Sequence, residues 1–128
     1  KKNRFHPLVW INGQPSIGKN VYIGGFSEIN SKGAKVSIGN NCDISSFVAI
    51  NVADSHLKTI GLRKTIVKKD IKIGNNVFIG SHSVILGGSI IKKNSVIAAG
   101  TVLRGEIVPE FSLAIGNPAK IKKNYYKN

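Results

Sequence analysis

The sequence predicts an all-β fold, a parallel β-helix of six-residue (hexapeptide) repeats with one protruding loop. Three observations carry this prediction. Aliphatic residues recur every six positions along most of the chain, and turn-forming residues fill the positions between them. The spacing is then interrupted over one long stretch, between Ile50 and Ile73. A short fixed period is typical of solenoid proteins, so the repeats decide the fold class.

A period of six residues favours strands over helices. A helix with 3.6 residues per turn would rotate an apolar stripe of this period away from the core. A short strand followed by a turn returns an aliphatic side chain to the interior at every repeat. Three such units close a triangular coil, and coils stack on one another. A small antiparallel sandwich is the alternative, but its strands are spaced more loosely, about 8–12 residues apart.

The repeats fall into three runs, separated by a slip of three residues and then by the long interruption. The inward positions of these runs are Ile11, Ile17, Ile23 and Ile29; Ile38, Ile44 and Ile50; and Ile73, Ile79, Ile85, Ile91, Ile97 and Leu103. We expect Ile115 and Ile121 to keep the phase of the third run, with Pro109 as the one break. Asn-Asn, Lys-Asn and Gly-Gly pairs between these positions predict the turns, because their residues tolerate a positive φ.

Cys42, the one cysteine, occupies a small inward position of a repeat. A buried thiol acts as a small hydrophobic group and is inert, so we do not expect an acyl-cysteine intermediate. One cysteine also excludes an internal disulfide and a cysteine-based zinc site. Together with the lack of a recognisable targeting signal, this predicts a cytoplasmic location.

The chain is strongly basic, with 19 Lys and Arg against six Asp and Glu and a net charge of +13. This balance favours an anionic partner. Aromatic residues make up only 7% of the chain, which argues against a stacking platform for nucleic acid and leaves a phosphate-rich cofactor or substrate. No apolar run is long enough to span a membrane.

Three stretches carry a resemblance to a known family: residues 73–81 (IGNNVFIGS), 98–102 (AAGTV) and 116–120 (GNPAK). They are similar to the later coils and the closing motif of the hexapeptide-repeat acyltransferases. Within that family, the chain looks like the sugar O- or N-acetyltransferase branch that includes galactoside and maltose acetyltransferases. The resemblance implies a left-handed β-helix and acetyl-CoA as the acyl donor. Because triangular coils expose three flat faces and the loop must meet a cofactor groove on another chain, we also expect a homotrimer.

We expect an N-terminal segment at residues 1–10, the β-helix at 11–123 and a C-terminal tail at 124–128. The interruption predicts a loop at about 55–70, and loops on a rigid scaffold commonly carry the chemistry. His56 opens this loop. Histidine exchanges protons near neutral pH, as a general base for acyl transfer must. The resemblance places the catalytic histidine here, and Asp54 is a candidate for orienting it or for capping the turn.

The other histidines are weaker candidates. His82 lies at a turn position and is expected to be exposed, and His6 is expected to be structural or disordered. The three histidines lie far apart in the sequence, with no pair at metal-ligand spacing, so we expect no metal site.

The resemblance also implies a cofactor site in a groove between subunits. Ser81 and Ala99 match positions whose backbone contacts the pantetheine arm of acetyl-CoA. Lys120 and Lys123 match basic residues near the adenosine phosphates, for which point charges are suited. Arg104 stands one position away from a basic residue of the family, so it is a further cofactor candidate.

The preferred interpretation is an acetyl-CoA-dependent acetyltransferase that acts directly on a hydroxyl or amino group of a sugar, either a nucleotide-linked sugar or a polysaccharide precursor. Two alternatives remain at this point. One is O-acetylation of an amino acid such as serine. The other is a non-catalytic β-helix scaffold, which would not bind CoA.

Overall fold

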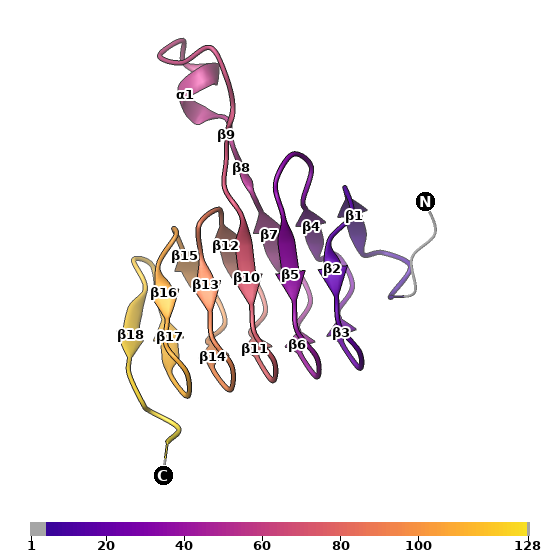
Figure 1. The fold of residues 1–128 in the computed structure, drawn as a ribbon, viewed down its shortest axis with the longest axis vertical. Coiled ribbons are helices and arrows are strands. Elements are labelled where there is room, and N and C mark those ends of the chain that lie inside the picture. Colours follow the sequence, from indigo (N-terminus) through magenta and orange to yellow (C-terminus); the bar gives the residue numbers. More distant parts are fainter. Residues whose placement is uncertain (1–4, 128) are drawn as a thin grey trace.

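Short strands stacked in successive coils make up almost the whole protein (Figure 1). The structure, a computed structural model, describes residues 5–127. Its strands form three parallel sheets, one on each side of a triangular coil. This arrangement confirms the predicted left-handed parallel β-helix. The expected N-terminal segment reaches into residues 1–4 and the expected tail ends at residue 128, and both of these parts lie outside the described residues.

Each sheet takes one strand from every coil. The first sheet contains β1 (Trp10–Asn12), β4 (Glu28–Asn30), β7 (Ala49–Asn51), β12 (Val84–Leu86) and β15 (Val102–Leu103). The second contains β2 (Ser16–Ile17), β5 (Val36–Ile38), β10 (Ile71–Ile73), β13 (Ile90–Ile91) and β16 (Ile107–Val108). The third contains β3 (Tyr22–Ile23), β6 (Asp43–Ile44), β11 (Phe78–Ile79), β14 (Val96–Ile97), β17 (Leu113–Ile115) and β18 (Lys120–Lys122). Strand β18 pairs antiparallel with β17 and closes the stack.

The repeat aliphatics stack in columns inside the coil. In the first sheet Ile29, Ile50 and Ile85 are in register and fully buried. A second set of buried positions is polar: the Ser27 and Ser83 hydroxyls donate to backbone carbonyls of neighbouring turns. No buried side-chain N or O atom lacks a partner among the described residues. The columns of the core are therefore apolar, and the buried polar side chains at the corners are all hydrogen-bonded.

Cys42 lies in this interior, as predicted from its position in the repeat. Its side chain is 2% exposed and its thiol donates to the Gly74 carbonyl. Burial raises the pKa of the Cys42 thiol. The neutral thiol is therefore the form present in the folded protein near neutral pH.

The predicted phase is wrong at Ile115. Val108, five positions later, is the buried residue of β16, and Ala114 rather than Ile115 faces the core. Ile115 is 41% exposed. The turn from β15 to β16 is one residue shorter than a regular repeat, so the inward residues of β16 and β17 come one position earlier than predicted. Ile121 of β18 is half-buried and packs against the core, as predicted. Ala114 then pairs with Ile97 in the third sheet.

All three departures from the six-residue spacing fall on the corner between the first and second sheets, here called corner 1–2. Ile29 and Ile38 are nine positions apart, Ile50 and Ile73 are 23 apart, and Leu103 and Val108 are five apart. The buried residues on either side of the other two corners keep a spacing of six throughout. The protein therefore varies its length at one corner of the triangle.

The longest of these departures is an arm that projects from the coil stack (Figure 1). Strands β8 (Ala53–Asp54) and β9 (Val67–Lys68) pair antiparallel and form its stalk. The one-turn helix α1 (His56–Thr59) lies beyond β8 and departs from the all-β prediction. The Ser55 carbonyl accepts the Thr59 N–H and hydroxyl, and Gly61, with φ +85°, follows the helix end.

Among residues 5–127, no helix combines the length and the apolar composition that a membrane span needs.

Candidate active site

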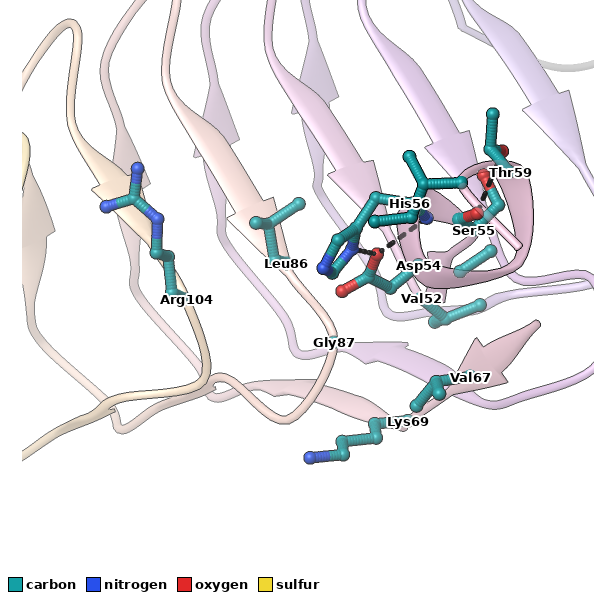
Figure 2. A pocket seen from close by; sticks show the side chains of 12 residues that line it. Val52, Asp54, Ser55, His56, Thr59, Val67, Lys69, Leu86, Gly87 and Arg104 are labelled. Carbon is teal, nitrogen blue, oxygen red and sulfur yellow. Dashed lines mark hydrogen bonds and ion pairs between the residues drawn. The ribbon is translucent and has the colours of Figure 1, made fainter. Parts of the chain in front are cut away.

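His56 and Asp54 form a hydrogen-bonded pair where the stalk of the arm meets helix α1 (Figure 2). Asp54 ends strand β8 and His56 begins helix α1, so the chain turns between them. One Asp54 oxygen, Oδ1, contacts His56 Nδ1 and also accepts the His56 backbone N–H at 3.3 Å. The carboxylate thereby fixes both the backbone and the ring of His56.

This pairing decides which ring nitrogen is available. An ionised carboxylate only accepts hydrogen bonds, so Nδ1 carries the proton and donates to Asp54. Nε2 of neutral His56 is then left with its lone pair. The hydrogen bond from the His56 ring is the main reason why the pKa of Asp54 is lowered from its ordinary value. Asp54 is therefore ionised near neutral pH, as an orienting carboxylate must be.

The pair borders a pocket of about 770 Å³ at corner 1–2. The stalk supplies Asp54 and Val67, helix α1 supplies His56 and Thr59, and the neighbouring coils supply Val52, Leu86 and Gly87. The His56 and Asp54 side chains are 66% and 56% exposed, so the imidazole is open to a ligand of the pocket. This geometry suits an imidazole that takes a proton from a bound acceptor.

Arg104 lines the same pocket, although the sequence analysis grouped it with the cofactor residues. It follows β15 at corner 1–2, and its Nη1 donates to Asn117 Oδ1 at 2.7 Å. Lys69 is a further lining residue that the sequence analysis passed over. The sequence indicated Lys69 only by its position at the end of the arm, directly before the repeats resume. In a chain of net charge +13, one more lysine did not stand out as a site residue.

Ser81 and Ala99 lie together at a different corner, between the third and first sheets. The Gly100 N–H donates to the Ser81 carbonyl at 2.9 Å, which stacks one turn on the other. The Ser81 hydroxyl donates to the Ser46 carbonyl at 2.8 Å. Neither Ser81 nor Ala99 lines the His56 pocket. Within one chain, the width of the first sheet separates these candidate cofactor residues from the candidate base.

Lys120 and Lys123 lie at the far end of the stack. Lys120 begins β18 opposite Ile115, and both lysine side chains are exposed. The hydrogen bond from Arg104 to Asn117 joins the turn after β15 to the turn before β18. The two lysines therefore lie on the last turns of the solenoid and not in the His56 pocket.

The two remaining histidines lie away from the pocket. His82 is exposed, as predicted, and takes a positive φ of 63°. Its ring stacks on Phe47 with centroids 4.9 Å apart, and Phe47 stacks on Phe26 at 5.0 Å. His6 Nδ1 accepts the Leu8 N–H, so the residue has a structural contact. No cluster of three or more His, Cys, Asp or Glu side chains within residues 5–127 has the arrangement of a metal site.

Comparisons with known families match both halves of the chain. The family of bacterial transferase hexapeptide (six repeats) matches residues 70–105, and the hexapeptide repeat of succinyl-transferase matches residues 15–51. The chain is 35% identical over 124 residues to the bifunctional protein GlmU of Clostridium botulinum, covering 91% of this chain and 26% of that protein. The chain thus spans about a quarter of the length of this curated relative.

Two solved structures share the fold. A galactoside acetyltransferase in complex with coenzyme A is 32% identical with a TM-score of 0.67, covering 90% of this chain and 63% of that one. The polySia specific acetyltransferase NeuO is 31% identical with a TM-score of 0.75, covering 89% of this chain and 54% of that one. With its matched repeats, its stacked coils and these structural relatives, the chain is a hexapeptide-repeat protein that is similar to acyltransferases of this fold.

Proposed function

We propose that this protein transfers the acetyl group of acetyl-CoA to a hydroxyl or amino group of a sugar, either a nucleotide-linked sugar or a polysaccharide precursor, in the cytoplasm. The observation that carries the proposal is the His56–Asp54 pair beside the corner 1–2 pocket. Two relatives support the donor and the acceptor class: one is an acetyltransferase for galactosides solved with coenzyme A, and the other is specific for polySia.

The proposed chemistry is a direct transfer with His56 as general base. His56 Nε2 takes the proton of the acceptor hydroxyl while the acceptor oxygen attacks the thioester carbonyl carbon. Backbone N–H groups stabilise the tetrahedral oxyanion. The intermediate collapses with cleavage of the carbon–sulfur bond, and the proton held by the imidazole passes to the CoA sulfur. Asp54 holds the ring throughout and stabilises its protonated form.

The donor residues are proposed on the other side of a subunit boundary. Ser81 and Ala99 would contact the pantetheine arm, and Lys120 and Lys123 would contact the adenosine phosphates. Because one chain holds the Ser81 turn and the His56 pocket at different corners, a site that combines them needs two chains. A ring of three chains brings the His56 corner of each to the Ser81 corner of the next.

The assay that tests the proposed function measures thiol release from acetyl-CoA. The acceptors are amino sugars, neutral and acidic sugars and their nucleotide-linked forms, and serine. CoA is expected to raise the melting temperature, and thiol is expected to appear with a sugar. Release with serine alone would assign the protein to amino acid O-acetylation, and the absence of any CoA effect on melting would favour a non-catalytic scaffold.

The proposed assembly gives the first prediction. The protein is expected to be a homotrimer, because each site is completed by a neighbouring chain. Light scattering at micromolar concentration should return three times the mass of the chain. A mass of 13.8 kDa, that of the single chain, would contradict both the trimer and the shared site.

The second prediction concerns the cofactor lysines. The double variant Lys120→Ala/Lys123→Ala is expected to raise the KM for acetyl-CoA and largely spare kcat, because it removes two charges that contact phosphates in the ground state and transition state alike. The affinity of wild type for CoA should fall with added salt. Dephospho-CoA should lose less affinity than CoA when the lysines are removed. Unchanged CoA affinity in the double variant would return both lysines to the role of solvated surface residues.

A further inference from the structure

Two cationic side chains border the pocket that His56 opens into. Lys69 lies at the end of the arm and Arg104 at the end of β15. Figure 2 shows Arg104 across Leu86 from His56, and Lys69 on the side of Gly87. The two cations come from segments far apart in the sequence, and the corner 1–2 turns bring both to one pocket.

Neither cation forms an ion pair with a carboxylate among the described residues. Within residues 5–127 the one ion pair is that of His56 with Asp54. The neighbouring acids are engaged with backbone groups: Glu106 accepts the Arg104 N–H and Asp70 accepts the Lys35 N–H. The Arg104 guanidinium donates from Nη1 to Asn117, a neutral amide that holds the side chain without cancelling its charge. Asp54 also lines the pocket, and the nearby Lys69 charge contributes to lowering its pKa, but this carboxylate is engaged with His56. The pocket therefore presents two cations that no ion pair holds.

Glycines keep the space beside these cations open. A Cβ at Gly87 would lie 2.9 Å from the Val52 carbonyl oxygen and 3.1 Å from the Lys69 carbonyl oxygen, so Gly87 lets the two backbones approach closely. A Cβ at Gly88 would lie 3.6 Å from Lys69 Cδ. A Cβ at Gly88 would also lie 3.6 Å from the Gly105 Cα, directly after Arg104. A side chain at Gly88 would therefore occupy the space between Lys69 and the turn that follows Arg104. The glycine leaves this space to a ligand group.

We propose that the acceptor sugar carries an anionic group, a carboxylate or a phosphate, which binds between Lys69 and Arg104 while its reacting hydroxyl or amine faces His56. This inference rests on the proposed function, and it names the charge class of the acceptor. It assigns Arg104 to the acceptor in place of the donor. In acetyl-CoA the whole pantetheine arm separates the phosphates from the thioester, so the donor offers no anion next to the reacting carbonyl. A guanidinium and an ammonium group both form strong charge-assisted hydrogen bonds to such an anion.

The test measures binding and transfer separately. The probes are galacturonate, glucuronate and glucose 1-phosphate, each compared with its neutral parent, galactose or glucose. Calorimetry with CoA-saturated protein gives the affinities of wild type, Lys69→Gln, Arg104→Gln and the control Lys64→Gln, a charge change on the arm outside the pocket. The uronate and phosphate arms distinguish a carboxylate from a phosphate as the group bound. The same variants are then assayed for acetyl transfer to each probe and for the KM of acetyl-CoA.

At least one anionic probe is expected to bind more tightly than its neutral parent. Lys69→Gln and Arg104→Gln should each weaken that binding about tenfold or more, with little change for the neutral parent, in Lys64→Gln or in the KM for acetyl-CoA. Equal losses for charged and neutral probes, or no preference for any anionic probe, would overturn the inference. An increase confined to the KM for acetyl-CoA would do so as well, by assigning the cations to the donor. Charge-dependent binding without acetyl transfer would instead count against the proposed function and leave the inference standing.

Discussion

Replacing His56 by alanine is expected to lower kcat by about 10²–10⁴-fold, the contribution of a positioned general base. Without the imidazole, the acceptor hydroxyl must lose its proton to water while it attacks the thioester. CoA binding should persist, because the proposed donor residues Ser81 and Ala99 lie at another corner. Folding should also persist, since the His56 side chain is 66% exposed and leaves no cavity.

Single-turnover acetyl transfer to one confirmed acceptor provides the measurement. His6→Ala serves as the matched control, because His6 lies outside the pocket. Asp54→Asn is expected to lower the rate as well, since an amide in place of the carboxylate no longer fixes the Nδ1–H tautomer. Wild-type rates in His56→Ala together with a loss in His82→Ala would relocate the base to the turn at Gly80–His82.

The pH dependence of the rate follows from the same pair. Because the His56 ring lowers the pKa of Asp54, the carboxylate is expected to remain ionised as the pH falls from neutral into the range where histidines protonate. The rate with a hydroxyl acceptor should therefore fall on acidification through loss of the neutral imidazole, before Asp54 is protonated. An amine acceptor adds its own protonation to the same side of the profile.

Replacing Ile97 by alanine is expected to lower the free energy of unfolding by about 2–5 kcal/mol. Ile97 is fully buried and lies between Ile79 and Ala114 in the column of the third sheet. The change to alanine removes the outer carbons of the side chain and leaves a cavity. The cavity cannot collapse, because hydrogen-bonded strands lie on both sides of it. The matched change Ile115→Ala should cost less than about 1 kcal/mol, because this side chain is 41% exposed.

Denaturant titration at one fixed protein concentration measures both variants, since assembly would otherwise shift the apparent stability. The pair also tests the phase of the last coil. If Ile115→Ala were as damaging as Ile97→Ala, Ile115 would face the core and the shortened turn before Val108 would be wrong.

The coil stack could be predicted from the sequence because its physics is local. A residue six positions after a buried aliphatic is buried again, so Ile85, Ile91 and Ile97 identify one another without any knowledge of the rest of the chain. The phase shift at Val108 could not be predicted, because Ile115 and Ala114 are both apolar and either one fits an inward position. Only the parallel pairing of Ala114 with Ile97 distinguishes them.

The candidate site was predictable in part, for a related reason. The break in the period located His56, and the closeness of Asp54 in sequence suggested its partner, although the carboxylate could equally have capped a turn. The side chains of the pocket come from turns of different coils, and no local pattern links Lys69 to Arg104. Their common position appears only when the arm and the turn after β15 are placed at the same corner.

The restriction of length changes to corner 1–2 has a consequence for how such a protein diversifies. Residues added or removed at this corner leave the stacking of the later coils intact. The arm between Ile50 and Ile73 is the example, because the first and second sheets both continue past it. At the other corners the turns keep the regular spacing and stack directly on one another: a Cβ at Gly80 would lie 2.4 Å from the Ala99 nitrogen. Corner 1–2 is thus the position where this scaffold accepts insertions. Segments that recognise different ligands can be exchanged there while the buried columns stay unchanged.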